Sequence, residues 1–588
     1  MASADIAVLA IFAPLLGAGL VPVAGLISAK ARDAAAIAFG LATAILTVLT
    51  LFAVTPTPAV ITRWIPVLNI PFSLRIDALG AYVAVIAGVI GFLVLLYSLA
   101  YMRHAAQEGY SLRRYYALVL LFIGAMIGLG LSDSLLAFYI FWETVGLCSF
   151  ALISYYHRDP KARRAGLKAF AVTRVGDIGL VVAIVAVWSA AGVLTFSGLL
   201  STALPAAILP VAAVGMLLAA LGKSAQMPLH VWLPDAMEAP TTISALIHAA
   251  TMVNAGVYLV ARVFPAFEGL GWWPASLLWI GAITALLAAI AAYVEPDIKR
   301  VLAHSTISQL GYMVSAVGAG AILASQFHLL SQAVFKALLF LAAGAVIQAV
   351  GTRDLYRMGG LRTAMPRTSW AFLIGVLAMV GIPIFNGFWS KDLLLEGILD
   401  HGDLGPFVLL GLAALATAAY SWRAYWLVFH GERRSPAAAR DAPWPMSYVI
   451  LALAGGAATT WLLIGPYSAA MAATMPAYPV EALGLSEAII AVLQIPAVVV
   501  TLVLAALSAY LVYGYARRFE AVLPGAAWPV RLIRSGYLFD AAYRRLAEGL
   551  AALAQRLRRT QTGDLNVNAA GILAALIIVL VVLLLEVL

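Results

Sequence analysis

Long apolar stretches separated by short polar gaps run along almost the whole chain. A helix rises 1.5 Å per residue, so about 20 apolar residues are needed to cross the hydrocarbon layer of a membrane. Stretches of about that length begin near positions 5, 33, 77, 114, 134, 165, 204, 239, 274, 300, 324, 368, 405, 446, 487 and 566. The pattern predicts an all-α polytopic membrane protein with about sixteen transmembrane helices.

Two segments depart from this pattern. Residues 63–77, RWIPVLNIPFSLRID, alternate apolar and polar positions and contain two prolines, which predicts a short extended hairpin at the outer surface. Residues 532–560 place leucines at helical spacing, with arginines mostly off that stripe. This pattern predicts an amphipathic helix along the inner membrane surface or against partner subunits.

The bulk composition agrees with a membrane environment. Hydrophobic residues make up 64% of the chain and charged residues 11%, against roughly 45–50% and 25% in soluble domains. Cys148 is the only cysteine, so the chain has no internal disulfide and lacks the thiolates of an iron–sulfur cluster. We therefore expect any redox chemistry to occur in other subunits.

The net charge of +9 is explained by membrane topology, because the basic residues occupy the gaps between apolar stretches; nucleic-acid binding is not expected. With the N-terminus outside, nearly all basic loop residues, including Lys299 and Arg300, fall on the inner side. The outer loops contain few basic residues, chiefly Arg63, Arg75 and Arg262. The N-terminal MASAD has no basic region, which indicates a first membrane helix and not a cleaved signal peptide. We expect a location in the cell inner (plasma) membrane with both termini on the outer or periplasmic side.

Ionisable residues lie inside several of the apolar stretches. A charge at the centre of a membrane helix costs at least about 2.5–3.5 kcal/mol, so such residues need partners or water. They are Glu143, Arg174, Asp177, Lys223, His248, His328, Lys336, Lys391 and Asp392. Arg174 and Asp177, three residues apart, could simply neutralise each other on one helix face. His248 could equally be a core histidine that donates to a backbone carbonyl.

Two of these lysines lie beside helix-breaking residues. Pro228 follows Lys223 and Pro383 precedes Lys391, and broken helices at membrane depth are tolerated only where they face protein or a water-filled cavity. A partly dehydrated lysine holds its proton less firmly, and a nearby carboxylate such as Glu143 reverses this effect. Movement of such a carboxylate could therefore make the lysine release or take up a proton.

His328 and Lys336 are eight residues apart, about two helical turns, with Gln332 between them. The three side chains can line one hydrated stripe, which suits a proton relay. A metal site is not expected there, because Gln332 replaces the second histidine of an i, i+4 pair and no acidic cluster accompanies it.

Five stretches of the chain are similar to a known family. They are FWETVGLCSFALISYYHRDPKARRAGLKAFAVTRVGDIG, GKSAQMPLHVWLPDAMEAPTTISALIHAATMVNAGVYLVAR, EPDIKRVLAHSTISQLGYM, FHLLSQAVFKALLFLAAGAVI and GFWSKD, all between residues 130 and 395. They resemble the antiporter-like proton-pumping subunits of respiratory complex I, NADH:quinone oxidoreductase, and most closely its L-type (NuoL-like) subunit. The wider superfamily is related to Mrp antiporters.

The resemblance implies two inverted five-helix repeats with broken helices, followed by an amphipathic lateral helix and a final transmembrane helix. By position, Glu143 and Lys223 resemble the glutamate–lysine pair of the first half-channel. Lys336, with His328, resembles the central connecting lysine, and Lys391 the outlet lysine of the second half-channel. The complete expected proton path is Glu143, Lys223, His248, His328, Lys336 and Lys391, supported by Arg174, Asp177, His230, Asp235, Gln332 and Asp392. Within this set, Asp177 matches an acidic residue near the boundary with a neighbouring pump subunit, and Gln332 stands where relatives often have histidine.

The predicted organisation has six segments. They are N-terminal helices and an outer hairpin over 1–113, a first antiporter-like half-channel over 114–263, a second half-channel over 274–430, additional transmembrane helices over 446–516, an amphipathic lateral helix over 528–562 and a C-terminal transmembrane helix over 566–588.

The resemblance implies a non-redox, proton-translocating subunit of an NADH:quinone oxidoreductase-type complex, with no catalytic chemistry of its own. No cofactor or metal is expected in this chain; NAD, FMN, iron–sulfur clusters and quinone belong to partner subunits. The expected partners are other membrane-arm subunits, including a second antiporter-like subunit, and the lipid bilayer.

Other functions remain open at this point. The chain could belong to a multisubunit Na⁺/H⁺ antiporter, a membrane-bound hydrogenase or formate-dependent complex, or an inorganic-carbon uptake complex, or it could be a membrane scaffold. Sodium selectivity calls for a compact cage of oxygen ligands. No such cage is evident in the sequence, so the proton is the expected ion.

Overall fold

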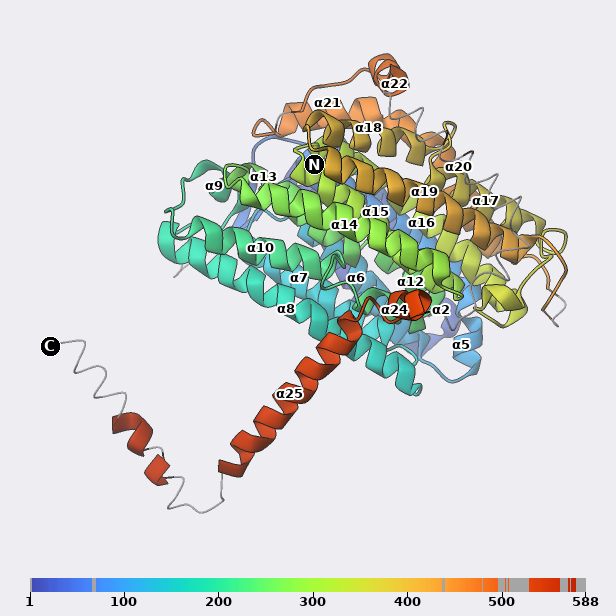
Figure 1. Ribbon diagram of the computed structural model, residues 1–588, viewed down its shortest axis with the longest axis horizontal. Coiled ribbons are helices and arrows are strands. Elements are labelled where there is room, and N and C mark those ends of the chain that lie inside the picture. Colours follow the sequence, from blue (N-terminus) through green and yellow to red (C-terminus); the bar gives the residue numbers. More distant parts are fainter. Residues whose placement is uncertain are drawn as a thin grey trace. The chain divides into compact units, whose positions relative to one another are not determined.

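The computed structural model of the chain describes residues 3–65, 70–435, 439–478, 480–494, 503, 506, 528–560, 569–571 and 573–577. The chain divides into two compact units, Met1–Pro524 and Gly525–Leu588. Helices make up most of the described structure, which confirms the all-α fold class (Figure 1). Eleven described helices are long and apolar enough to cross a membrane.

The N-terminal part of the first unit contains two long helices, a hairpin and a third span. Its elements are α1 (Ser3–Ile27), α2 (Ala29–Leu51), β1 (Ala59–Ile65), β2 (Ile70–Leu74), α3 (Ala78–Val85), η2 (Ile86–Ile90), α4 (Gly91–Tyr101) and α5 (Arg103–Gln107). Ser28 caps α2 by accepting a hydrogen bond from the Ala31 amide. The strands β1 and β2 pair antiparallel, which confirms the predicted extended hairpin.

The next part of the chain forms the helices around Lys223. They are α6 (Leu112–Leu131), α7 (Leu135–Ile153), α8 (Pro160–Ala191), α9 (Phe196–Ser201), α10 (Leu209–Lys223), α11 (Trp232–Asp235), η3 (Ala236–Glu238), α12 (Thr241–Ala249) and α13 (Met252–Phe267). The helix α10 ends at Lys223 itself, and the prolines that follow it lie in turns and short helices. The predicted interruption after Lys223 is therefore confirmed. A second break separates α12 from α13 just after His248.

A comparable set of helices follows around Lys336 and Lys391. They are α14 (Trp272–Val294), α15 (Ile298–Gly318), α16 (Ile322–Val350), η4 (Leu355–Arg357), α17 (Pro366–Val380), α18 (Asn386–Asp400) and α19 (Leu404–Phe429). The span over 366–400 is broken between α17 and α18. The start of α18 approaches the end of α17 so closely that a Cβ atom on Gly387 would overlap the carbonyl oxygen of Ala378. Only glycine fits this contact without a shift of the backbone.

The remaining described elements are α20 (Trp444–Thr459), η5 (Thr460–Leu463), α21 (Ile464–Thr474) and α22 (Leu485–Gln494) in the first unit, and α24 (Trp528–Arg534) and α25 (Phe539–Thr560) in the second. The predicted amphipathic segment is thus two helices separated by a turn. Four leucines of α25 recur at helical spacing and are exposed, namely Leu546, Leu550, Leu553 and Leu557.

The predicted number of spans is only partly tested by the described residues. Two apolar helices, Leu209–Lys223 and Pro366–Val380, are shorter than a full span because each is part of a broken one. The spans predicted near 487 and 566 lie largely outside the described residues. The count of about sixteen therefore stays a prediction.

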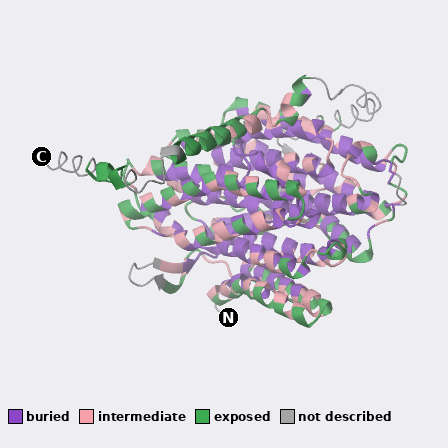
Figure 2. Cartoon of the chain, turned by 90° about the horizontal axis from the view of Figure 1, so that it is seen from below, coloured by how far each residue is buried: buried purple, intermediate pink, exposed green. Residues whose placement is uncertain are grey.

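Buried residues run through the interior of the helical bundle, and exposed positions lie at its periphery (Figure 2). Arg75 lies in the loop between β2 and α3, as predicted, but it is buried. Arg262 and Lys299, also assigned to loops from the sequence, lie in helices and are buried, which corrects that assignment. Arg262 belongs to α13, and Lys299 donates to the carbonyl oxygens of Met237 and Ala239. A hydropathy pattern places such residues at the ends of spans because it does not register partners from other segments.

Candidate functional site: buried charges at broken helices

Four charged side chains from α7, α8 and α10 lie close together. Arg174 Nη1 is 2.6 Å from Glu143 Oε1, and Lys223 Nζ is 3.5 Å from Asp177 Oδ1. These direct partners differ from both expectations drawn from the sequence, a Glu143–Lys223 pair and mutual neutralisation of Arg174 and Asp177. Arg174 and Asp177 of α8 each pair with an opposite charge on a neighbouring helix, Glu143 of α7 and Lys223 of α10. They are not an ion pair with each other.

The Asp177–Lys223 pair is buried and held by two residues of α7. Trp142 Nε1 donates to Asp177 Oδ1 at 2.6 Å, and Lys223 Nζ lies 5.3 Å from the centre of the Trp142 ring, within cation–π range. Gly146 leaves space for the ammonium group, since a Cβ atom at this position would lie 2.8 Å from Lys223 Nζ. The position of Lys223 at the last residue of α10 also favours a positive charge there.

The Glu143–Arg174 pair is more exposed than the Asp177–Lys223 pair. The exposed fraction of the side chain is 21% for Glu143 and 35% for Arg174, against 2% for Asp177 and 0% for Lys223. The four charges therefore form one buried pair and one pair at the lateral surface of the bundle.

His248 connects α12 to α16. The histidine is fully buried, and its ring centre lies 4.6 Å from that of Phe340, one turn after Lys336 on α16. Neither ring nitrogen of His248 has a hydrogen-bond partner among the described residues. The alternative interpretation, a core histidine bound to a backbone carbonyl, is thus not what the structure contains.

Lys336 and Lys391 contact the same residue of α17. Lys336 donates to the Ser305 hydroxyl and lies 3.3 Å from the sulfur of Met379. Lys391 donates to the main-chain carbonyl of Met379 at 2.8 Å and to that of Val380 at 3.4 Å. Because these carbonyls end α17, the negative end of the helix dipole faces the Lys391 ammonium.

His328 lies on α16 two turns before Lys336. Its Nε2 is 3.0 Å from Gln309 Oε1, and its Nδ1 is 2.9 Å from the hydroxyl of Ser390, the residue before Lys391. Gln332, between His328 and Lys336, is fully buried, and neither of its amide atoms has a protein partner among the described residues. Asp392, next to Lys391, is also fully buried.

The two remaining supporting residues, His230 and Asp235, lie in the connection after α10. Asp235 pairs with Lys168 of α8 at 2.7 Å and with Arg300 of α15 at 3.3 Å. His230 Nδ1 is 3.3 Å from the Pro228 carbonyl oxygen. The Asp235 contacts tie the connection to two long helices, which positions the end of α10.

Several residues of this site were missed by sequence reasoning. They are Trp142, Gly146, Ser305, Gln309, Met379 and Ser390. Residues of these types are common in membrane helices, so the sequence gives no sign of their role. Only their contacts with the ionisable residues identify them as part of the site. Within the described segments, no three His, Cys, Asp or Glu side chains gather where they could hold a metal ion.

Comparison with known proteins places this arrangement in a family. The family described as "NADH:quinone oxidoreductase/Mrp antiporter, TM" matches residues 132–417, and that described as "NADH-Ubiquinone oxidoreductase (complex I), chain 5 N-terminus" matches residues 64–116. Together the two matches cover more than half of the chain and every residue of the predicted proton path.

Similar curated proteins are subunits of quinone oxidoreductases. NADH-quinone oxidoreductase subunit L of Escherichia coli is 45% identical over 378 residues, which are 62% of this chain and 60% of the relative. NAD(P)H-quinone oxidoreductase chain 5 of Picosynechococcus sp. is 46% identical over 376 residues, 61% of this chain and 56% of the relative. The matched region thus spans between half and two thirds of each relative's length.

Two solved assemblies contain similar chains. One is the Mrp complex from Dietzia sp., with a TM-score of 0.79 and 27% identity over 99% of this chain and 63% of the other. The second is an archaeal respiratory membrane complex, the membrane-bound sulfane sulfur reductase, with a TM-score of 0.71 and 25% identity over 80% of this chain and 99% of the other. The protein is therefore a multi-pass membrane protein that belongs to the NADH:quinone oxidoreductase/Mrp antiporter family of antiporter-like membrane subunits.

Proposed function

We propose that this chain is a non-redox, proton-translocating subunit of an NADH:quinone oxidoreductase-type complex in the cell inner (plasma) membrane. The observation that carries the proposal is the series of fully buried lysines Lys223, Lys336 and Lys391 inside the helical bundle. Lys223 has a carboxylate partner at 3.5 Å, whereas the contacts described above for the other two are hydroxyl, thioether and carbonyl groups. Intramembrane lysines are expensive, so their presence indicates an ion pathway.

The first step of the proposed mechanism is an exchange among the four charges around Lys223. Asp177 stabilises the Lys223 ammonium in the structure, and Glu143 is bound to Arg174. If Asp177 moves away from Lys223, the buried ammonium loses its counter-charge and gives up its proton more readily. Arg174 can follow either carboxylate while remaining charged, because a guanidinium does not deprotonate in proteins.

The later steps lead through His248 to Lys336 and Lys391. Buried polar atoms that lack protein partners, such as both ring nitrogens of His248 and both amide atoms of Gln332, require water. We infer a hydrated path from Lys223 past His248 to Lys336. From there, Met379 separates the two lysines, and His328 contacts the neighbour of Lys391. Release at Lys391 completes the proposed transfer.

A partner subunit is proposed to cover the Glu143–Arg174 pair. The pair is partly exposed on a surface that also exposes apolar side chains, including Leu147 at 54% and Ile178 at 58%. Lipid would not solvate this ion pair. A second antiporter-like membrane subunit with polar groups opposite the pair is the proposed neighbour, and electron transfer, with NAD, FMN, iron–sulfur clusters and quinone, is assigned to further subunits.

One alternative has an observation in its favour. The chain aligns over 99% of its length with part of a protein in the Mrp complex from Dietzia sp., so a subunit of a multisubunit Na⁺/H⁺ antiporter is the second candidate. The two candidates differ in their partners and in whether ion movement depends on electron transfer.

The test starts from the complex as it exists in its native membrane. Gentle detergent purification and mass spectrometry of co-purifying proteins should identify NADH- or quinone-reacting subunits. In liposomes, NADH-driven proton uptake should then be lost in a Lys223→Met variant that still assembles and transfers electrons. Replacement of the exposed Lys30 by Met is the matched control. A normal proton-to-electron ratio in Lys223→Met would refute the proposal, and co-purification of small antiporter subunits alone would favour the second candidate.

A further inference from the structure

A row of buried polar residues on α13 is not used by the proton path described above. Asn254, Tyr258 and Arg262 follow one another at four-residue intervals, so they share one face of the helix. All three are buried, with exposed fractions of 0–1%. The row begins just after the break between α12 and α13, close in sequence to His248. Asn254 Oδ1 has no protein partner among the described residues, so the start of the row is polar and able to bind water.

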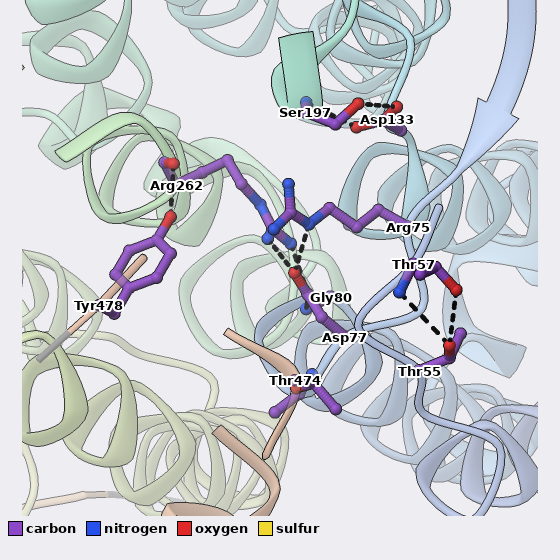
Figure 3. A network of polar contacts seen from close by, with 12 residues as sticks. Thr55, Thr57, Arg75, Asp77, Gly80, Asp133, Ser197, Arg262, Thr474 and Tyr478 are labelled. Atoms are coloured by element: carbon purple, nitrogen blue, oxygen red, sulfur yellow. Dashed lines mark hydrogen bonds and ion pairs between the residues drawn. The ribbon is translucent and has the colours of Figure 1, made fainter. Parts of the chain in front are cut away.

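The row ends in a compact group of charges formed by Arg75, Asp77 and Arg262, which we call the α13 charge cluster. Arg262 holds the Asp77 carboxylate through both terminal nitrogens, with Nη2 at 2.8 Å from Oδ1 and Nη1 bound to Oδ2. Arg75 Nε donates to Asp77 Oδ2 at 2.8 Å. Figure 3 shows the two guanidinium groups converging on the single carboxylate.

Contacts around the cluster join four segments distant in sequence. Tyr258 donates to the Gly130 carbonyl oxygen at 2.6 Å and is bound by Arg262 Nη2 at 2.8 Å. Tyr478 donates to the main-chain oxygen of Arg262 at 2.6 Å, and the Ala78 amide donates to Thr474 Oγ1 at 3.1 Å. The ends of α6, α13 and α21 and the start of α3 therefore meet here. The predicted topology places all four on the outer side.

The charges of the cluster do not balance. Two guanidinium groups share one carboxylate, which gives a formal charge of +1. Asp133 makes no ion pair with either arginine among the described residues. It accepts hydrogen bonds from neutral groups, namely the Ser197 amide at 2.9 Å, the Ser197 hydroxyl at 2.8 Å and the Ser73 hydroxyl at 3.3 Å, so it is not a member of the cluster. Arg75 and Arg262 remain charged at all physiological pH values. A fixed positive charge in a water-poor interior raises the energy of any cation that approaches it.

We propose that the α13 charge cluster is an electrostatic plug that prevents protons from crossing between the outer side and the His248 region along the polar face of α13. The inference rests on the proposed function, because it assumes that protons pass through the His248 region. With this route closed, protons leave through Lys391. Arg75 and Arg262 thus exclude ions by their charge, a role that a purely structural ion pair would not have.

The test measures passive proton permeability of the complete complex in liposomes without an electron donor. A potassium diffusion potential set with valinomycin drives the protons, and an internal pH dye records them. Arg262→Gln and Arg75→Gln each lower the cluster charge to zero and should increase the leak by about tenfold, the effect of one unit charge about 10 Å away at an effective dielectric constant of about 20. Replacement of the exposed Arg63 of β1 by Gln is the matched control and should not change the leak.

Two further variants separate charge from packing. Asp77→Asn breaks the ion pairs but raises the cluster charge to +2, so it should not leak. The double variant Asp77→Asn with Arg262→Gln restores +1 and should leak less than Arg262→Gln alone. The proposal is overturned if Asp77→Asn leaks as much as Arg262→Gln, if the double variant leaks at least as much, or if both arginine variants remain as tight as the unchanged complex. If Arg262→Gln fails to assemble, Arg75→Gln tests the proposal by itself, because the Arg75 side chain is less completely buried than that of Arg262.

Failure of the plug and failure of the proposed function give different results. The leak assay needs no electron transfer, whereas the proposed function is judged by NADH-driven pumping in Lys223→Met. A complex that pumps normally but shows no leak in the arginine variants refutes only the plug. A complex with no proton pumping in its unchanged form refutes the proposed function, whatever the leak.

Discussion

The ammonium group of Lys391 donates a hydrogen bond to the main-chain carbonyl of Met379 at 2.8 Å. Met379 is the next-to-last residue of α17, so the lysine occupies the negative end of a half-helix that stops inside the bundle. Lys336 touches the sulfur of the same methionine at 3.3 Å. Two buried lysines therefore contact the same residue at the break between α17 and α18. The break also frees main-chain carbonyl oxygens at the end of α17, which would be bonded within an unbroken helix.

Lys391→Arg should keep the charge at the end of α17 but prevent its release, because a guanidinium does not lose its proton under these conditions. We expect an assembled complex with normal electron transfer and proton pumping reduced at least tenfold. The measurement is the proton-to-electron ratio in liposomes. Lys161→Arg, at an exposed position at the start of α8, is the matched control. Pumping by Lys391→Arg at the normal ratio would show that Lys391 does not exchange protons.

Gly146→Ala should disturb Lys223 without removing any charge. A Cβ atom at position 146 would lie 2.8 Å from Lys223 Nζ, too close for an undisturbed contact, so the ammonium group must move relative to Asp177. We expect pumping to fall severalfold in a complex that still assembles. Gly411→Ala on α19 is the control, because no atom lies within 4 Å of the Cβ position there. Equal pumping in the two variants would contradict the described position of Lys223.

Trp142→Phe tests the hydrogen bond that fixes Asp177. The substitution keeps an aromatic ring near Lys223 but leaves the buried carboxylate without the indole donor at 2.6 Å. Hydrogen bonds to charged groups contribute about 1.5–3 kcal/mol, so the temperature of unfolding of the subunit in detergent should fall measurably. The exposed Trp188→Phe on α8 is the control. If both variants unfold at the same temperature as the unchanged protein, the indole does not stabilise Asp177.

The sequence was sufficient to predict the kind of fold and the buried lysines Lys223, Lys336 and Lys391. Apolar stretches and proline positions locate the spans and the breaks at Lys223 and Lys391, because these depend on local physical properties. The partners could not be predicted. Asp177 faces Lys223 and Glu143 faces Arg174 only because α7, α8 and α10 pack with a particular rotation.

The partner of Arg262 could not be predicted from the sequence either. It stands near the end of an apolar stretch, where a charge is normally assigned to a loop. Its partner Asp77 lies 185 residues earlier in the chain, and no periodicity links the two positions. Trp142 and Met379 were likewise missed because an apolar residue becomes part of a polar site only through its neighbours in space.

Asp441 provides a pH-dependent prediction outside the membrane-spanning helices. Burial raises the pKa of its carboxyl, but hydrogen bonds from the Thr368 hydroxyl at 2.6 Å and from Arg367 and Ala442 outweigh burial and hold the pKa below the usual value for aspartate. By accepting from the Arg367 and Thr368 amides, Asp441 caps the start of α17. It thereby anchors the half-helix whose other end contacts Lys391.

A carboxyl with a lowered pKa in the folded protein stabilises it above the ordinary aspartate pKa of about 3.9, and this contribution is lost as the pH falls through the folded value. Asp441→Asn should therefore lower the unfolding temperature at neutral pH, in line with about 0.5–2 kcal/mol for loss of a helix cap. The difference between variant and unchanged protein should shrink below about pH 4. Thermal unfolding in detergent at a series of pH values measures this, with Asp403→Asn, at an exposed aspartate before α19, as the control. A difference that stays constant with pH would show that the Asp441 charge does not stabilise the start of α17.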